Sequence, residues 1–254
     1  MFGFGRGEGK CSTDKHKHMK ILAFDTSTEL ISIAVTRPVH GVAQVWQHTG
    51  AGGAQASSGL IPAIELLMAQ AELRYAQLDA IAFGQGPGSF TGLRTACSVA
   101  QGLAFGAGLK VLPIDTLLAV AEEARHQHAP EQPNCRVLAL LDARMDELYV
   151  AHYEFDRGAW TQREDFQLLH PEDVTLQGSQ ALAGNVFAGY GERLRVPPDL
   201  PRWQALPTAA AMLRLAPALW AGGHALAPDE ALPRYIRDKV AKTTLERAAE
   251  KAAS

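Results

Sequence analysis

An apolar strand that ends in an acidic residue occurs twice in this chain, and each copy is followed by a turn and a second strand. The first copy, Lys20–Asp25, precedes a strand at Leu30–Thr36. The second copy, Arg136–Leu141 with Asp142 directly behind it, precedes a strand at Glu147–Phe155. Repetition of one supersecondary unit is typical of an internal duplication. The sequence therefore predicts two lobes built on one plan.

The predicted order of strands and helices restricts the fold class of the first half of the chain. Apolar runs bounded by turn residues predict three consecutive strands, after which helices and strands alternate to give the order βββαβαβα. The predicted strands are Lys20–Asp25, Leu30–Thr36, Val42–His48, Ala80–Phe83 and Lys110–Ile114, and the predicted helices are Leu60–Leu73, Thr91–Gly106 and 116–126. A Rossmann domain would alternate strictly from its first strand. The pattern instead indicates one lobe of the two-lobed α/β actin-like (ASKHA, sugar kinase/heat-shock cognate) fold.

Helices become scarce in the second half, so the second lobe is expected to be degenerate and shortened. A strand near Trp160–Leu168 and the segment Ala181–Asn185 are followed by a single helix, Thr208–Gly222. We expect four parts: a disordered leader (1–18) ahead of a start at Met19, a first lobe (19–128), a truncated second lobe (129–228) and a loose basic tail (229–254).

Composition excludes several classes of protein. The formal net charge of −3 gives no global attraction to nucleic acid or to an anionic membrane. No apolar run approaches the ~20 residues that span a bilayer. The three cysteines form neither a disulfide framework nor a paired metal motif, which favours a cytoplasmic protein.

The turn after the first strand, Asp25-Thr26-Ser27-Thr28, has the residues of a phosphate loop. Small hydroxyl residues there let backbone N–H groups face a phosphate, and an acid can hold hydrated Mg²⁺. A hairpin turn capped by the acid is the alternative. The matching turn of the second lobe, Asp142-Ala143-Arg144, lacks the glycine that lets a backbone approach phosphate closely. We therefore expect a vestigial phosphate loop in a half-built cleft, with no cofactor.

No catalytic or metal-binding pattern stands out. The chain has no HExxH motif, and its histidines lack partners at ligand spacing. The glycines around Ser89 stand at the wrong offsets for the nucleophile elbow of a hydrolase. We expect no catalytic residue and no metal.

The stretch from Gly84 to Arg94 predicts a tight loop that opens a helix. Gly84, Gly86 and Gly88 permit a sharp turn, and Ser89 or Thr91 can cap the helix. That helix carries small residues on several faces: Thr91, Gly92, Thr95, Ala96, Ser98, Ala100, Gly102, Ala104 and Gly106. Small residues let another helix approach closely, so a partner outside the lobe is predicted; dense packing within the lobe is the alternative.

Three stretches resemble the TsaB (YeaZ) family: Met19–Glu29, Gly86–Arg94 with Gln101–Ala104, and Leu141–Tyr149. The resemblance runs from about Met19 to Val240. It implies a non-catalytic subunit in the synthesis of N6-threonylcarbamoyladenosine (t6A) at position 37 of tRNAs that read ANN codons. It further implies heterodimer formation with a TsaD-type transferase, recruitment of a TsaE-type ATPase, homodimers when the chain is alone, and contact with tRNA only through the complex.

The resemblance places the partner interface on the first lobe, on the helices Leu60–Leu73 and Thr91–Gly106. The predicted interface residues are Leu60, Ile64, Met68, Ser89, Phe90, Thr91, Leu93, Arg94, Thr95, Ser98, Val99 and Gly102. An independent ATP-dependent kinase or ATPase of the actin-like class stays open as the alternative function. The basic residues Arg234, Arg237, Lys239 and Lys242 could contact tRNA phosphates or form a solvated terminus.

Overall fold

Alternation of side chains along the first strands explains how the first sheet separates two cores. In the computed structural model, which describes residues 19–236, Leu22 and Phe24 face one side of the sheet and Ile21 and Ala23 face the other. The sheet has the order β3-β2-β1-β4-β5, with antiparallel pairing in the first three strands and parallel pairing from β1 to β5. Its strands are β1 (Ile21–Asp25), β2 (Leu30–Val39), β3 (Val42–Ala51), β4 (Ala80–Gly86) and β5 (Lys110–Asp115).

The second sheet repeats this order. It runs β8-β7-β6-β10-β11, with β6 and β7 as an antiparallel hairpin and β6, β10 and β11 parallel, while β9 also pairs with β7. Its strands are β6 (Asn134–Arg144), β7 (Glu147–Asp156), β8 (Ala159–Gln162), β9 (Gln167–Leu169), β10 (Ala181–Gly184) and β11 (Arg202–Gln204). β6 thus takes the place of β1, and the predicted duplication and actin-like fold are confirmed.

The two lobes differ in their helices. The first lobe has α1 (Ala56–Gln70) between β3 and β4 and the 18-residue α2 (Phe90–Ala107) between β4 and β5. At the position that matches α2, the second lobe has only the four-residue α4 (Phe187–Tyr190). The predicted shortening of the second lobe is therefore real, and it consists of lost crossover helices rather than lost strands.

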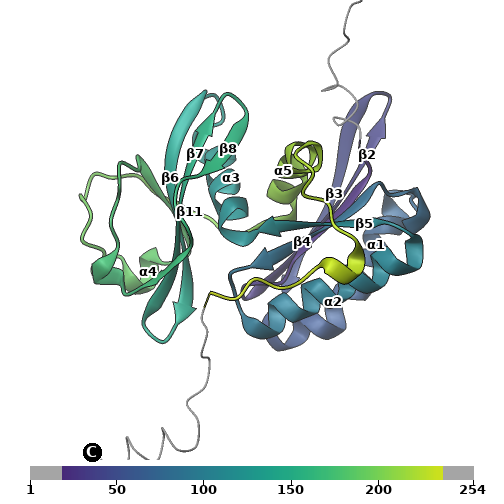
Figure 1. Cartoon of the computed structure of the whole chain (residues 1–254), viewed down its shortest axis with the longest axis horizontal. Coiled ribbons are helices and arrows are strands. Elements are labelled where there is room, and N and C mark those ends of the chain that lie inside the picture. Colours follow the sequence, from purple (N-terminus) through teal and green to yellow (C-terminus); the bar gives the residue numbers. More distant parts are fainter. Residues whose placement is uncertain (1–18, 237–254) are drawn as a thin grey trace, which may run out of the picture.

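Figure 1 shows how the helices are layered on the two sheets. α1 and α2 cover one face of the first sheet, and α5 (Ala209–Ala221) packs on its other face. α3 (Thr116–His128) lies between the lobes, where its apolar residues pack on β6 and β7. A separate apolar cluster fills the far side of the second sheet, beneath α4.

Ionic contacts join α3, α5 and β8. Glu122 accepts hydrogen bonds from Arg125 (3.0 Å), Trp160 (3.0 Å) and Arg214 (2.8 Å), and Arg214 also reaches Glu123 at 2.6 Å. Although burial acts in the opposite direction, these donors lower the pKa of Glu122. The network fixes α5 against α3 and the second lobe against both.

Two expected boundaries need correction. The helix predicted at the end of the second lobe, α5, belongs to the first lobe, because Ala209, Met212 and Ala216 pack against β1, β4 and β5. The tail expected to be loose from residue 229 is packed as far as Ile236, and Ala231 is fully buried beneath α2. The leader 1–18 and residues 237–254, including Arg237, Lys239 and Lys242, lie outside the described residues.

Smaller differences concern element ends. α1 begins at Ala56, four residues before the predicted start, and no side chain caps it. Of the two candidate caps of α2, Ser89 is the one used, and Asp115 caps α3. The strand predicted near Trp160–Leu168 is divided into β8 and β9.

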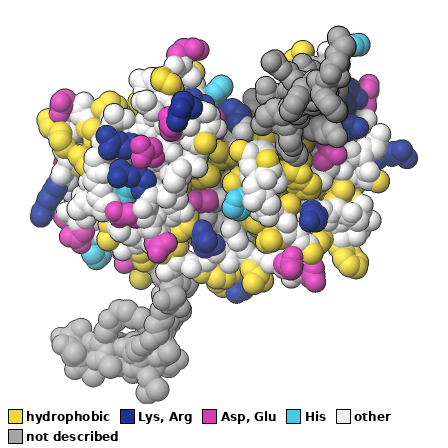
Figure 2. Space-filling model, turned by 45° about the horizontal axis from the view of Figure 1, so that its top comes forward, with side chains coloured by type: hydrophobic (Ala, Val, Ile, Leu, Met, Phe, Trp, Pro, Cys, Tyr) yellow, Lys and Arg dark blue, Asp and Glu magenta, His cyan; other side chains and the backbone are white. Residues whose placement is uncertain are grey.

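Charged and hydrophobic side chains are unevenly distributed over the surface (Figure 2). In this view charges of both signs are scattered over the second lobe, and hydrophobic side chains gather toward the first lobe. None of the helices within residues 19–236 combines the length and the apolar character that crossing a membrane requires.

Candidate functional site

The carboxyl group of Asp25 is directed into the protein. Its side chain is 1% exposed, and Oδ1 accepts hydrogen bonds from the backbone N–H (2.8 Å) and the hydroxyl (2.6 Å) of Ser27. Oδ2 has no hydrogen-bond partner among the described residues and lies against Gly84, where a Cβ would come within 1.8 Å of it. Burial raises the pKa of Asp25 to about 6, against the opposing effect of the two Ser27 hydrogen bonds.

The phosphate-loop residues are used to hold the loop that follows β4. The Thr26 hydroxyl donates to the carbonyl of Gly92 at 2.6 Å, and the Ser89 N–H donates to the carbonyl of Ser27 at 2.8 Å. Glycine is required at this contact, because a Cβ at Gly92 would lie 1.8 Å from the Thr26 oxygen. The turn and the start of α2 therefore form one packed unit.

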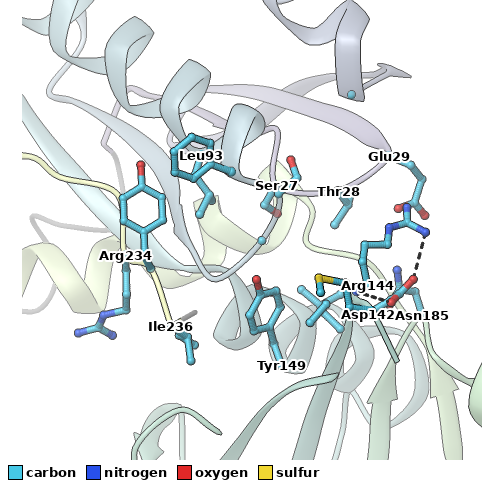
Figure 3. A pocket seen from close by; sticks show the side chains of 18 residues that line it. Ser27, Thr28, Glu29, Leu93, Asp142, Arg144, Tyr149, Asn185, Arg234 and Ile236 are labelled. Carbon is cyan, nitrogen blue, oxygen red and sulfur yellow. Dashed lines mark hydrogen bonds and ion pairs between the residues drawn. The ribbon is translucent and has the colours of Figure 1, made fainter. Parts of the chain in front are cut away.

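A cleft of 430 Å³ lies between the lobes. Figure 3 shows Ser27, Thr28 and Glu29 on its first-lobe side, facing Asp142 and Arg144. Other lining residues come from β4–α2, from the second lobe and from the C-terminal segment: Gly88, Ser89, Phe90, Leu93, Tyr149, Asn185, Arg234, Tyr235 and Ile236. Asp25 itself does not line the cleft.

The second-lobe turn is closed by its own side chains. Asp142 forms an ion pair with Arg144 (3.2 Å) and accepts a hydrogen bond from the Tyr190 hydroxyl at 3.2 Å. Its backbone N–H donates to Asn185 at 3.1 Å. Arg144 has φ 62°, a left-handed conformation that favours glycine. The turn thus has the backbone shape of a glycine-rich loop, although the sequence has an arginine at position 144, where such a loop would have glycine.

A second acidic group lies between the lobes and was not singled out in the sequence. Asp115, at the end of β5, accepts a hydrogen bond from the Tyr153 hydroxyl on β7 and another from the Leu117 N–H at 2.9 Å. Burial raises the pKa of Asp115 to about 7, although the Tyr153 and backbone hydrogen bonds act in the other direction. No local motif marks this pair, because its members stand on different lobes.

The predicted interface residues divide into two sets. Four of them are core residues: Leu60 and Ile64 are 0% exposed, Leu93 is 1% and Met68 is 4% exposed, so their assignment to a partner surface is wrong. Leu60, Ile64 and Met68 occupy the inner stripe of α1, which packs on the sheet, and Leu93 is a buried residue of α2 at the wall of the cleft. The others lie on the outer side of α2 or at its start, exposed or half-buried: Ser89, Phe90, Thr91, Arg94, Thr95, Ser98, Val99 and Gly102.

The outer side of α2 is a shallow groove next to α1. It has a volume of 470 Å³ and is lined by Ser57, Phe90, Thr91, Arg94, Thr95, Ser98 and Val99. A Cβ at Gly102 or Gly106 would meet nothing within 4 Å. Phe105, 83% exposed, ends the same helical stripe and was missed, because its apolar side chain fits the core pattern equally well. We call this surface, residues 90, 91, 94, 95, 98, 102 and 105, the α2 face.

The part of the chain that the structure describes has no candidate metal site. Nowhere in 19–236 do three His, Cys, Asp or Glu side chains gather in a way that could hold a metal ion.

A family model and two curated relatives connect this chain with the threonylcarbamoyladenosine modification of tRNA. Residues 52–198 match the sequence model of the family tRNA N6-adenosine threonylcarbamoyltransferase, TsaD. The tRNA threonylcarbamoyladenosine biosynthesis protein TsaB of Escherichia coli is 33% identical over 237 residues, which cover 88% of this chain and 96% of the relative. TsaB of Haemophilus influenzae is 35% identical over 241 residues, with the same coverage.

Among solved structures, YeaZ from Pseudomonas aeruginosa superposes with a TM-score of 0.75 at 36% identity. The superposition covers 86% of this chain and 100% of that chain. The similarity therefore extends over both lobes.

Proposed function

Since this chain belongs to the TsaB family of tRNA threonylcarbamoyladenosine biosynthesis proteins, we propose that it is a non-catalytic subunit that binds a TsaD-type transferase and holds it in its active form. The complex forms t6A at position 37 of ANN-decoding tRNAs in the cytoplasm. The tRNA is contacted only through the complex, which a TsaE-type ATPase joins.

The α2 face is the observation that carries this proposal. Its middle residues Thr91, Thr95, Ser98 and Gly102 have small side chains, and Gly102 and the neighbouring Gly106 leave open space above the helix. A helix with so little bulk lets a second backbone approach closely, which gives many contacts per residue. Phe90 and Phe105, 41% and 83% exposed, stand at its two ends and supply the apolar area that an interface needs.

The likeness to the transferase family supports the choice of partner. A chain that matches the TsaD family model over 52–198 shares its supersecondary plan. Two subunits of like fold can pair through equivalent helices in a pseudo-twofold arrangement. For the same reason the α2 face can pair with a second copy of this chain when the transferase is absent.

The state of the cleft supports a non-catalytic role. The carboxyl group of Asp25 is buried and does not line the cleft, and that of Asp142 is engaged by Arg144 and Tyr190. The hydroxyl of Thr26 is used to hold α2. Asp25 Oδ1, the Thr26 hydroxyl and the Asp142 carboxyl group are therefore engaged in contacts within the fold.

An independent ATP-binding kinase or ATPase is the second candidate. It is favoured by the volume of the cleft, 430 Å³, and by the Ser27, Thr28 and Ser89 hydroxyls on its wall. Titration calorimetry with ATP and Mg²⁺ separates the two functions. Micromolar binding by the isolated chain, with turnover, would favour the enzyme.

The proposal is tested by co-purification with the TsaD-type protein of the same organism, followed by an assay of t6A in tRNA. Ser98→Arg places a long charged side chain in the middle of the α2 face and is expected to abolish both complex and modification. Ala188→Arg adds the same group to the exposed α4 of the second lobe and serves as the control. A complex that forms normally with Ser98→Arg would place the partner elsewhere.

A further inference from the structure

The C-terminal segment Ala231–Ile236, here called the strap, passes α2 and continues to the second lobe (Figure 1). The carbonyl of Ala231 accepts a hydrogen bond from Gln101 of α2 at 3.0 Å. Farther along, the Arg234 N–H donates to the carbonyl of Gln85 at 2.8 Å. The strap is therefore fixed to the first lobe at both points by its backbone, and its side chains are placed accordingly.

Side chains of the strap reach both lobes. The Arg234 guanidinium lies 4.8 Å from the centre of the Phe166 ring, and Ile236 packs against the apolar cluster of the second lobe. Tyr235 contacts the first lobe instead, where its ring lies 5.3 Å from that of Phe90 at the start of α2.

Tyr235 and Phe90 together position Arg94. The Nε–H of Arg94 donates to the Tyr235 hydroxyl at 3.0 Å, and its guanidinium carbon lies 3.7 Å from the centre of the Phe90 ring. Within residues 19–236, no carboxylate pairs with Arg94, and its two terminal nitrogens make no hydrogen bond. An exposed arginine is thus held in one place without a counter-charge.

Such an arrangement suits a binding anchor. A long side chain ordinarily loses rotamer freedom when it binds, and this cost is reduced when it is held beforehand. A guanidinium whose terminal nitrogens are free presents a planar pair of donors that matches a carboxylate. Arg94 lines the groove of the α2 face, so its donors stand where a partner helix would lie.

On the basis of the proposed function, we propose that Arg94 is the charged anchor of the α2 face and binds a carboxylate side chain of the TsaD-type partner. Tyr235 of the strap is the residue that positions it. The strap, which also contacts the second lobe through Arg234 and Ile236, thereby contributes to an interface otherwise built by α2.

The test measures the Kd of the heterodimer by titration calorimetry at low and high salt. Arg94→Gln removes the charge and is expected to raise Kd by about tenfold to a hundredfold, because truncating one member of a buried interface pair is costly. It should also weaken the salt dependence of Kd. Arg94→Lys keeps the charge without the paired donors and should give an intermediate Kd. Arg157→Gln, at an exposed ion pair of the second lobe, is the control.

Tyr235→Phe tests the positioning role. It keeps the ring on Phe90 and removes only the hydroxyl that Arg94 contacts. Kd should rise severalfold, and Arg94→Gln combined with Tyr235→Phe should bind no more weakly than Arg94→Gln alone, because the hydroxyl acts through the arginine. Full additivity of the two changes would refute the positioning role.

The outcomes separate this inference from the proposed function. If Ser98→Arg abolishes binding but Arg94→Gln leaves Kd within twofold of the wild type, the α2 face stands and the anchor is overturned. If Arg94→Gln weakens only self-association, the carboxylate belongs to a second copy and the inference is likewise overturned. If the wild-type chain does not bind the transferase, both fall.

Discussion

Two glycines of one helix should respond in opposite directions to the same substitution. In Gly92→Ala, the new Cβ would lie 1.8 Å from the carbonyl oxygen of Thr26. The two atoms would have to separate by roughly 1 Å or more before the contact became tolerable. Such a shift breaks the Thr26–Gly92 and Ser89–Ser27 hydrogen bonds and leaves their buried groups unpaired, at about 1–3 kcal/mol each. We expect a loss of roughly 3–5 kcal/mol.

Gly102→Ala is the matched control. The Cβ meets nothing within 4 Å, and the position lies in the interior of α2. Alanine is favoured over glycine there by about 0.5–1 kcal/mol, because it loses less backbone entropy on folding. This variant should therefore be slightly more stable than the wild type.

Calorimetric melting measures both effects. One kcal/mol corresponds to a Tm shift of about 2–4 °C for a chain of this size, so Gly92→Ala should melt roughly 10 °C lower and Gly102→Ala about 2 °C higher. A Tm of Gly92→Ala within about 2 °C of the wild type would refute the argument that the phosphate-loop residues form a packed unit with α2. A clear loss in Gly102→Ala would show that the α2 face is already covered.

Three further predictions concern buried charges. The pKa of Asp25 is raised from 3.8 to about 6 in the folded chain, so the folded state binds a proton that the unfolded state has lost in this pH window. The free energy of unfolding should therefore fall by about 3 kcal/mol as the pH rises from about 4 to about 6. In Asp25→Asn, urea unfolding should no longer show this part of the pH dependence. Tyr153→Phe removes a hydrogen-bond donor to Asp115 and should lower the free energy of unfolding by about 1–3 kcal/mol. It should also raise the pKa of Asp115 further, which carboxyl NMR would detect, and an unchanged pKa would contradict the contact. Arg214→Gln should cost about 2–4 kcal/mol in urea unfolding, because the buried Glu122 and Glu123 lose a partly buried partner. A loss below about 0.5 kcal/mol would show that this network does not fix α5.

The local pattern of turn residues and apolar positions in the sequence was sufficient to predict most of the fold. The strands β1 to β5 and the helices α2 and α3 lie where turn residues and hydrophobic period place them, and Asp115 and Ser89 cap helices as their residue types suggest. The position of α5 could not be predicted, since its apolar stripe would suit either sheet. Only the packing of Met212 against the first sheet decides it.

The candidate site was less predictable, for two physical reasons. A helix with small residues all round does not reveal which stripe is inside, so Leu93 was assigned to the surface although it is buried. Contacts between distant segments leave no local pattern: neither the pairing of Asp115 with Tyr153 nor that of Arg94 with Tyr235 is marked by spacing. Composition along the tail indicated a loose basic end, whereas its described part, up to Ile236, is packed and includes the buried Ala231.

The asymmetry of the duplication supports the proposal that the first lobe is the one that docks. Both sheets keep the same strand order, but the second has the four-residue α4 where the first has α2. A lobe without long crossover helices covers its sheet with loops, and loops cannot present the continuous stripe that helix packing needs. The first lobe therefore presents the outer surface of the long helix α2 next to the cleft, and the strap contacts both this helix and the second lobe. Loss of the crossover helices from the second lobe would thus leave a protein that keeps the actin-like order of strands. Its α2 face is suited to binding a partner, and its acidic residues Asp25 and Asp142 make contacts within the fold.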